Sequence, residues 1–396
     1  MAGAKAMENI DTELVELCRD LIRQPSLSGQ EEGVAMVIKK KMEDLGYDDI
    51  HIDDYGNVIG GFFGKRPGKT VVMDGHIDTV DISDRSRWTH DPFAADIDNG
   101  RIYGRGTSDM KGADSAMIIA AARFARNRDF AGKVYVSCSC QEEIFEGVST
   151  RAVSEYCRPD YVIIGESTQL RLNIGQRGRA EIVVETEGKT CHSANPEKGV
   201  NAVRHMVALL EEIFKIEPAE HPLLGKGMME LTDIVSSPFP GQSVVPGLCT
   251  ATFDRRLIVG DTQEKILEPI NQAIEKVRAN LPNLKARCYI REGEHPSWKG
   301  MNVKATRFFP GWVLDKDDEL VRKAYKGITE AGVKTELSHY SFCTNGSHFC
   351  GEAGIKTIGF GPSLENLAHT IDEYIEIDQL QKAELGYEGI LKELLK

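Results

Sequence analysis

The N-terminal part of the chain alternates between two hydrophobic periods, one typical of amphipathic helices and the other of strands. Segments 11–26 and 31–46 place their apolar residues on one helical stripe, with Asp11 as a possible N-cap and Gly46 as a stop. Short β-rich apolar runs follow at 69–75, 133–140 and 160–166, and a helical segment at 110–127 separates the first two. Apolar strands that alternate with helices predict an α/β fold with a mixed, largely parallel sheet flanked by helices.

The pattern changes near residue 177. From there it indicates strand, helix, strand, helix and strand, over 179–188, 198–215, 248–259, 262–281 and 285–291. That order is typical of a compact α+β unit in which two helices cover an antiparallel sheet. The segment 293–312 is rich in Gly and Pro, which favours a return linker, and α/β patterns resume after it. We therefore predict a larger domain in two parts, 1–176 and 293–396, with a small domain inserted at 177–292.

Length and composition fit this two-domain interpretation. The chain has 396 residues, more than the roughly 250–300 at which single hydrophobic cores usually split. Hydrophobic residues make up 41% and charged residues 28% of the sequence, so sizeable cores can form. Nine cysteines, an odd number with no CxxC pair, indicate neither a disulfide framework nor a thiolate zinc site.

The charge balance narrows the classes of partner. A formal net charge of -13 without any block of Lys and Arg argues against nucleic acid and against an anionic membrane surface. The sequence has no run of roughly 18 apolar residues, and its N-terminal residues lack the apolar stretch of a signal peptide. We expect a cytoplasmic protein with a small-molecule partner.

Polar residues stand where the predicted strands end. In VVMDGHIDTV, His76 and Asp78 lie two apart on one side of an extended backbone, so the imidazole could bind a metal while Asp78 orients its other ring nitrogen. A structural histidine tied to a carboxylate explains that pair about as well. In IYGRGTSDMKG, Asp109 stands in a glycine-rich turn before a helix that we expect to begin near Met110. Asp109 could bridge two cations or serve only as an N-cap.

Glutamates leave the next two strands. Glu142 and Glu143 follow the strand at 133–140, and one could bind metal while the other takes a proton from water, although an adjacent acidic pair is more often a solvated turn. Glu166 ends the strand at 160–166, where open α/β sheets place ligands, and His369 precedes the C-terminal helix. Each signal is weak alone, but together they predict a bridged pair of metal sites.

The motifs HxD at His76, GRGxxDMKG around Asp109 and the adjacent glutamates resemble those of a co-catalytic zinc metallopeptidase family. That family contains aminoacylase, acetylornithine deacetylase, succinyl-diaminopimelate desuccinylase and zinc carboxypeptidase, and the resemblance runs from Gly75 to His369. It implies two divalent metal ions, with zinc as the first expectation and cobalt or manganese as alternatives.

The resemblance also implies a role for each residue of the cluster. One metal would be held by His76, Asp109 and Glu166, and the other by His369, Asp109 and Glu143. Glu142 would be the general base and Asp78 the orienter of His76. A cis peptide bond would follow Asp109.

The inserted domain resembles the lid and dimerisation domain of the same family. KTCHSANPEKGVNAV matches the segment whose histidine stabilises the oxyanion, usually across a dimer interface, which implies that role for His192 and a homodimer through this domain. FDRRL matches the family's D-x-R, so Arg256 would hold a substrate carboxylate.

Two departures from the family pattern lie on the substrate side. GQSVVPG has Ser243 where relatives usually have Asn, and CTNGSHF replaces a glycine-rich GTSD loop. Further substrate contacts are therefore expected from Ser243 and from the loop residues Thr344, Asn345, Gly346 and Ser347. The combination resembles an uncharacterised branch associated with selenium metabolism.

The expected activity is hydrolysis of the amide bond of a small carboxylate-bearing peptide or N-acyl amino acid. Two metals would lower the pKa of a water molecule, Glu142 would accept its proton, and His192 would polarise the carbonyl. Carbamoyl-cleaving relatives usually have His where Glu166 stands, so the glutamate favours peptide or N-acyl cleavage. Two alternatives stay open: a hydrolase of carbamoyl or ureido acids, and a non-catalytic binding protein on the same fold.

Overall fold

The computed structural model describes residues 10–396, and the chain folds as two compact units. Unit 1 comprises Met1–Gln176, Glu294–Val303 and Trp312–Lys396, and unit 2 comprises Arg177–Gly293 and Lys304–Gly311. Residues 1–9, on which our expectation about a signal peptide partly rests, lie outside the described residues. Within the described part, no helix is both long enough and apolar enough to cross a membrane.

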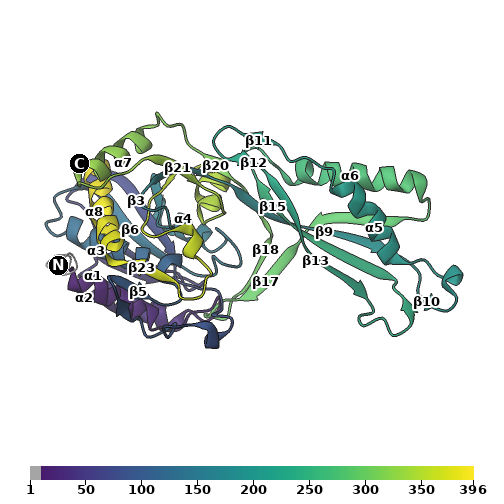
Figure 1. The fold of residues 1–396 in the computed structure, drawn as a ribbon. Helices are drawn as coiled ribbons and strands as arrows, with labels where there is room; N and C mark the ends of the chain where they lie inside the picture. The colour runs from purple at the N-terminus through teal and green to yellow at the C-terminus, as the bar shows by residue number, and fades with distance from the viewer. Residues whose placement is uncertain (1–9) are drawn as a thin grey trace. The chain divides into compact units, whose positions relative to one another are not determined.

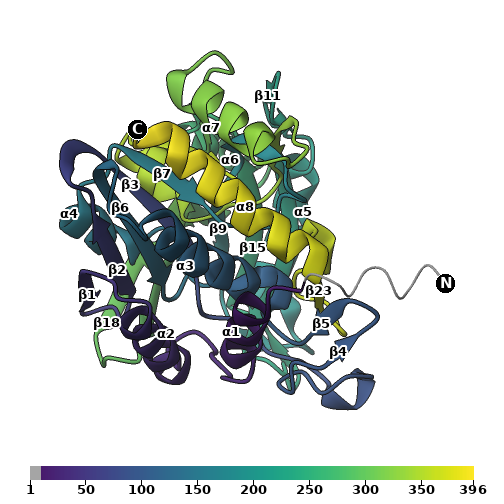
Figure 2. The same ribbon diagram turned by 90° about the vertical axis from the view of Figure 1, so that its left-hand side faces the viewer.

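A nine-stranded mixed sheet forms the centre of unit 1 (Figures 1 and 2). The strand order is β1 (Asp49–Ile52), β2 (Val58–Phe63), β6 (Ala131–Ser139), β3 (Arg66–His76), β7 (Tyr161–Ile164), β22 (Lys356–Gly359), β8 (Leu172–Gln176) and β20 (Trp312–Val313), with β21 (Leu337–Tyr340) beside β8. The central strands β6, β3, β7 and β22 pair in parallel, whereas β1, β2 and β20 add antiparallel pairs. The sheet confirms the predicted mixed α/β architecture.

Helices cover both faces of this sheet. They are α1 (Thr12–Ile22), α2 (Glu32–Asp44), α3 (Gly112–Phe124), α4 (Thr150–Cys157), α7 (Glu319–Glu330) and α8 (Ile377–Leu394). The α3 helix packs against α8 (Figure 2), and the Cβ position of Gly75 faces Met117 of α3. Val72, three residues earlier on β3 and therefore on the opposite face, packs with Val153 of α4. The central strands are thus buried on both sides.

A smaller sheet in unit 1 joins segments that are far apart in the chain. It consists of β23 (Tyr374–Glu376), β5 (Arg101–Tyr103) and β4 (Ile97–Asp98). Ile375 is paired with Ile102 in an antiparallel ladder. This pairing ties the chain after His369 to the chain before Asp109.

Unit 2 is built on a five-stranded antiparallel sheet covered by two helices. Its strands are β13 (Met228–Ser237), β15 (Leu248–Leu257), β9 (Gly178–Glu187), β16 (Lys285–Ile290) and β19 (Phe308–Phe309). The buried stripes of α5 (Ala202–Ile213) and α6 (Gln263–Asn280) form one apolar core with these strands. Asn201 and Thr262 cap the two helices by accepting hydrogen bonds from backbone N–H groups. The unit confirms the predicted two helices on an antiparallel sheet.

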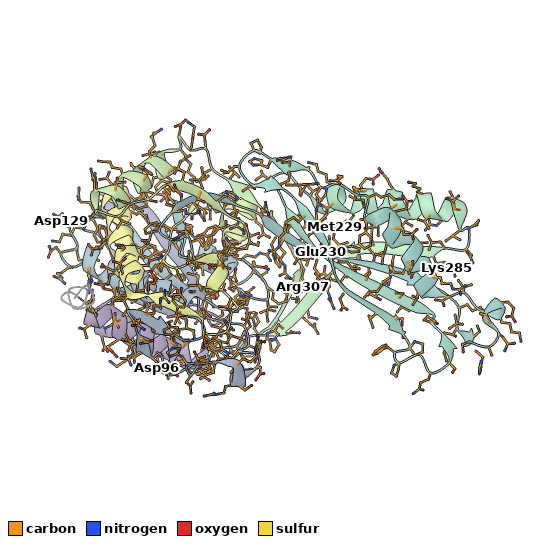
Figure 3. All side chains as sticks on the ribbon, in the orientation of Figure 1. Asp96, Asp129, Met229, Glu230, Lys285 and Arg307 are labelled. Atoms are coloured by element: carbon orange, nitrogen blue, oxygen red, sulfur yellow. The ribbon has the colours of Figure 1, made fainter. Side chains whose placement is uncertain are left out.

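The two ends of the unit 2 sheet carry different extensions. Met229, which is paired with Arg255, and Lys285, which is paired with Glu187, mark these ends (Figure 3). Beyond the Glu187 end, β10 (Cys191–His192) and β14 (Val244–Val245) form a short ribbon. A second ribbon consists of β11 (Glu220–His221) and β12 (Gly225–Lys226).

The segment 293–312, which we expected to be a return linker, contains paired strands. It contains much of β17 (Glu292–Pro296) and β18 (Asn302–Thr306), which pair with each other, and all of β19. The Gly and Pro residues suggested a break in structure, but Phe308 and Phe309 pair with β9 and Trp312 pairs with β8. Pairing partners far away in the sequence supply the hydrogen bonds that local composition could not predict.

The apolar core of unit 2 predicts a large loss of stability for Phe253→Ala. Phe253 on β15 is 0% exposed, whereas Phe214, at the end of α5, is 63% exposed. Removing the buried ring leaves a cavity, so we expect the free energy of unfolding to fall by about 3–5 kcal/mol. Phe214→Ala, the matched control, should change it by less than about 1 kcal/mol. Urea denaturation followed by circular dichroism measures both, and equal effects would contradict this core.

Candidate metal centre

Three neighbouring parallel strands deliver polar residues to one edge of the unit 1 sheet. His76 is the last residue of β3, Glu166 follows β7, and Glu142 and Glu143 follow β6. Because β6, β3 and β7 run in parallel, their carboxyl ends lie at the same edge. The strand order therefore brings together residues that lie far apart in the sequence.

Asp109 lies between the two histidines. Its Oδ1 is 2.9 Å from His76 Nε2, and its Oδ2 is 3.1 Å from His369 Nε2. The helix that we expected near Met110 begins at Gly112, because Thr107–Lys111 forms a wider turn in which Asp109 and Met110 have non-helical backbone angles. The Asp109–Met110 peptide bond is cis, as expected.

The glutamates complete two overlapping groups around His76. Glu166 Oε1 lies 3.2 Å and Glu142 Oε2 3.9 Å from His76 Nε2, and Glu143 Oε2 lies 3.0 Å from His369 Nε2. The two groups suited to hold a metal ion are His76 with Glu142 and Glu166, and His76 with Asp109 and Glu143. All members are buried or half-buried, which suits donors that face an ion instead of solvent.

Asp78 orients His76 through its backbone carbonyl, whereas we expected its side chain to do so. His76 Nδ1 donates a hydrogen bond to the backbone carbonyl of Asp78 at 2.8 Å, and the Asp78 carboxylate lies farther from this nitrogen, at 3.6 Å. The carboxylate accepts instead from the backbone N–H groups of Glu142 at 3.0 Å and Glu143 at 3.2 Å, and from Ser28 Oγ at 2.7 Å. Asp78 therefore fixes His76 with its backbone and the glutamate pair with its side chain.

Glu373 is a functional residue that the sequence analysis missed. Its buried carboxylate accepts hydrogen bonds from the backbone N–H groups of Gly106, Ser108 and Asp109, at 3.1, 2.7 and 3.1 Å. It also pairs with Arg105 at 2.7 Å. Glu373 thus holds the turn that presents Asp109. The acidic end of LAHTIDE was the available signal, but an acidic residue near a helix start is too common to single out.

Burial first, and neighbouring carboxylates second, set the electrostatics of the site. Burial raises the pKa of Glu142 well above its ordinary value, and burial together with the charge of Asp109 raises the pKa of Glu143 to about 7. Burial and the charge of Asp109 also raise the pKa of Glu166. Hydrogen bonds to Asp109 and Glu143 raise the pKa of His369 to about 10. Without a cation, the charges of this site destabilise one another unless protons neutralise them.

His192 and Ser243 lie together at one end of unit 2. His192 is paired with Val244, and the backbone N–H of Ser193 donates to the carbonyl of Ser243 at 2.8 Å. The imidazole of His192 is exposed, and its Nδ1 accepts a hydrogen bond from the backbone N–H of Ala194 at 3.0 Å.

Arg256 lies at the opposite end of the unit 2 sheet. It is on β15, paired with Arg179 on one side and Met228 on the other. Its Nε forms an ion pair with Asp254 Oδ1 at 3.0 Å. The D-x-R motif is therefore an internal ion pair along one face of the strand, with most of the guanidinium left for another partner.

The loop residues proposed as substrate contacts are buried in unit 1. Thr344 Oγ1 donates to Gln176 Oε1 at 2.5 Å. Asn345 Nδ2 donates to Asp74 Oδ2 at 2.9 Å and to Ser139 Oγ at 2.8 Å. Asn345 thus joins the residues Asp74 and Ser139 of two neighbouring strands. Gly346 and Ser347, which follow it in the loop, are buried as well.

Known proteins resemble this chain over nearly its whole length. It is 32% identical over 375 residues to the uncharacterized protein YgeY of Escherichia coli K12, covering 92% of this chain and 90% of that protein. It is 26% identical over 409 residues to succinyl-diaminopimelate desuccinylase 2 of Ruegeria, covering 99% and 97%. The crystal structure of Sso-CP2, an M20 family metallo-carboxypeptidase from Sulfolobus solfataricus, has a TM-score of 0.74 at 18% identity and covers 97% of this chain and 99% of its own.

The family model for peptidase family M20/M25/M40 matches residues 72–393. This range contains all of the polar residues gathered at the sheet edge and the whole of unit 2. The match shows that the chain belongs to peptidase family M20/M25/M40 and is a metal-dependent hydrolase that acts on amide bonds.

Proposed function

We propose that the chain binds two divalent cations, with zinc as the first choice and cobalt or manganese as alternatives, and uses them to hydrolyse a small peptide or N-acyl amino acid. His76, Asp109 and Glu166 would hold one cation, and His369, Asp109 and Glu143 the other. The observation that carries the proposal is the position of Asp109, whose two oxygens face different histidines. Imidazole nitrogens and carboxylate oxygens are donors that zinc accepts.

The donor set fits two cations for an electrostatic reason. Four carboxylates, those of Asp109, Glu142, Glu143 and Glu166, gather around the buried imidazole of His76 and the exposed imidazole of His369. Burial and the neighbouring charges raise the pKa values of these glutamates, so the site without a cation disfavours their ionised form. When bound, two divalent cations would offset that charge, lower the pKa of a water molecule and polarise a carbonyl group.

Glu142 is the residue that we propose as general base. Its side chain is buried, and its Oε1 has no hydrogen-bond partner among residues 10–396. Asp78 holds the backbone of this residue, so the free oxygen has a defined position. Such a carboxylate can accept a proton from water and later deliver it to the leaving amine.

The substrate end of the proposal rests on unit 2. Arg256 is proposed to bind the substrate carboxylate, Ser243 and the loop Thr344–Ser347 stay candidate substrate contacts, and His192 would stabilise the oxyanion. Glu166 stands where carbamoyl-cleaving relatives usually have His, which supports peptide or N-acyl amide cleavage. A cytoplasmic location stays a prediction.

The geometry of unit 2 supports a homodimer in which His192 acts on the partner's substrate. Arg256 and Leu248 stand at opposite ends of β15, roughly 26 Å apart for an extended strand, and His192 lies beyond the Leu248 end. One small substrate cannot contact both residues of the same chain. If both contact substrate, His192 comes from a second copy.

An exposed edge strand supports the same dimer. β13 is at the edge of the unit 2 sheet, and its residues Ile234 and Val235 are 46% and 48% exposed. An apolar edge strand offers unpaired backbone groups to a second chain.

Glu142→Gln tests the general base. The amide keeps the shape of the side chain but cannot accept the proton, so we expect kcat for an N-acyl amino acid to fall about 10²–10⁴-fold while the metal content is unchanged. The control is Glu155→Gln, an exposed position on α4. Steady-state kinetics and elemental analysis measure the two quantities, and near-native turnover of Glu142→Gln would remove the base from this residue.

Metal binding should depend on pH through His369. In the metal-free protein its pKa is raised to about 10 by Asp109 and Glu143, so the imidazole holds a proton at neutral pH. A cation must displace that proton, and metal affinity should therefore rise as pH increases from neutral toward 10, with protons released on binding. Calorimetry of zinc binding in buffers of different ionisation enthalpy measures this release.

Asp109→Asn tests the metal centre, and Asp129→Asn is its matched control. The first removes the shared ligand and should lower the affinity for both cations, whereas Asp129 is an exposed residue outside the site. Binding that is independent of pH, or two tightly held cations in Asp109→Asn, would contradict the bridged centre.

Mixing two inactive variants tests whether His192 acts across the dimer. Glu142→Gln supplies an intact His192, and His192→Ala supplies an intact Glu142. An equal mixture should recover about a quarter of the wild-type activity, because half of the dimers are mixed and each holds one complete site. Activity assays with each variant alone serve as controls, and no recovery after proven exchange of subunits would show that His192 does not act in trans.

A further inference from the structure

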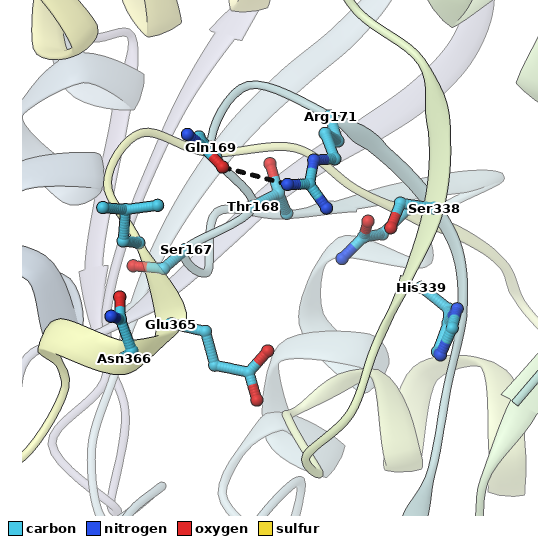
Figure 4. A pocket seen from close by; sticks show the side chains of 10 residues that line it. Ser167, Thr168, Gln169, Arg171, Ser338, His339, Glu365 and Asn366 are labelled. Carbon is cyan, nitrogen blue, oxygen red and sulfur yellow. Dashed lines mark hydrogen bonds between the residues drawn. The ribbon is translucent and has the colours of Figure 1, made fainter. Parts of the chain in front are cut away.

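A polar pocket of about 400 Å³ lies in unit 1 between two segments that adjoin proposed metal ligands in the chain (Figure 4). One segment, Ser167–Arg171, directly follows Glu166, and the other, Leu364–Asn366, shortly precedes His369. Ser167 Oγ donates to the carbonyl of Ser108 at 2.8 Å, and Ser108 precedes Asp109 in the chain. The pocket is thus built from the same loops as the metal centre.

Two opposite charges line this pocket. Figure 4 shows Arg171 on one side and Glu365 on the other, with the guanidinium turned toward the space between them. Arg171 Nη2 donates to Gln169 Oε1 at 3.0 Å, and its Nε is 3.4 Å from Glu336. Among residues 10–396, no further partner engages the third nitrogen, Nη1. Glu365 Oε1 accepts a hydrogen bond from Ser341, and its other oxygen has no hydrogen-bond partner within the described part of the chain.

The remaining walls exclude an apolar occupant. They carry hydroxyl, amide and imidazole groups, and of the described lining residues only Leu364 is apolar. Burying an apolar side chain against these groups would remove water from them without replacing its hydrogen bonds. The pocket therefore suits a polar group of a substrate.

The opposite charges of Arg171 and Glu365 further limit which polar group of a substrate the pocket can bind. A substrate end with only a carboxylate would face the like charge of Glu365, and one with only an ammonium would face the like charge of Arg171. An end that carries both satisfies each wall, because a guanidinium binds a carboxylate through paired N–H groups and a carboxylate accepts from an ammonium.

The geometry points to a specificity subsite at Arg171 and Glu365 that binds an amino-carboxylate end of the substrate, away from the amide that is cut. This inference deepens the proposed function and rests on it, because we assign the pocket to substrate binding from its position beside the proposed metal ligands. Arg171 and Glu365 are assigned to substrate choice, and the metal ligands and Glu142 to the chemistry.

Three compounds that differ only at that end test the subsite. γ-Glutamylglycine has an ammonium and a carboxylate there, glutarylglycine lacks the ammonium, and 4-aminobutanoylglycine lacks the carboxylate. Calorimetry with zinc-loaded Glu142→Gln protein measures their dissociation constants without turnover. We expect γ-glutamylglycine to bind about tenfold more tightly than either of the others.

Single variants in the same background assign the two charges. Arg171→Gln should remove the advantage given by the carboxylate, and Glu365→Gln the advantage given by the ammonium. Arg126→Gln and Glu32→Gln, at exposed positions outside the pocket, are matched controls and should keep the full preference. Zinc content should be the same in all four proteins, which checks that the metal loops are intact.

The outcomes separate this inference from the proposed function. If the wild-type protein cleaves amides but the three compounds bind equally, or if Arg171→Gln and Glu365→Gln keep the full preference, the subsite is overturned. If the preference is present and depends on both residues, the subsite stands even where the wild-type protein cleaves no amide. Failure to cleave would overturn the proposed function alone.

Discussion

The structure depends on one constraint, the placement of Asp109 with an oxygen toward each of two histidines. Glu373 enforces this placement by accepting three backbone N–H groups from the turn that carries Asp109. The antiparallel ladder between β23 and β5 then joins the chain after His369 to the chain before Asp109. The ladder and Glu373 thus hold the segments that carry Asp109 and His369, the two residues at the centre of the proposed metal site.

The parallel sheet positions the other polar side chains of the site without any special local structure. A strand end leaves backbone and side chain free of the ladder, and three adjacent ends give His76, Glu166 and the glutamate pair a common edge. Asp78 orders this edge further. Its backbone carbonyl holds the imidazole of His76, and its carboxylate holds the backbone of Glu142 and Glu143. Burial of so many carboxylates is tolerated only with cations or protons to offset their charge.

The proposals assign chemistry and substrate choice to different parts of the molecule. The proposed metal ligands lie in unit 1, with His76 and the glutamates at the sheet edge and Asp109 and His369 in turns outside it. Residues proposed to meet the substrate lie on loops and on unit 2, including Arg256, His192 and the charged walls formed by Arg171 and Glu365.

The α/β class, the inserted α+β unit, the family and the positions of the polar residues at strand ends could all be predicted from the sequence. These features are local, since each depends on hydrophobic period or on a short motif such as HxD around His76. Which residues are neighbours could be seen only once the chain was folded. Several features join segments that lie far apart in the chain. They are the hydrogen bonds of Glu373 to the Asp109 turn, those of the Asp78 carboxylate to Glu142 and Glu143, the pairing within 293–312, and the facing charges of Arg171 and Glu365. Contacts of that kind leave no periodic signal, because they arise from how elements pack and not from the composition of any one segment.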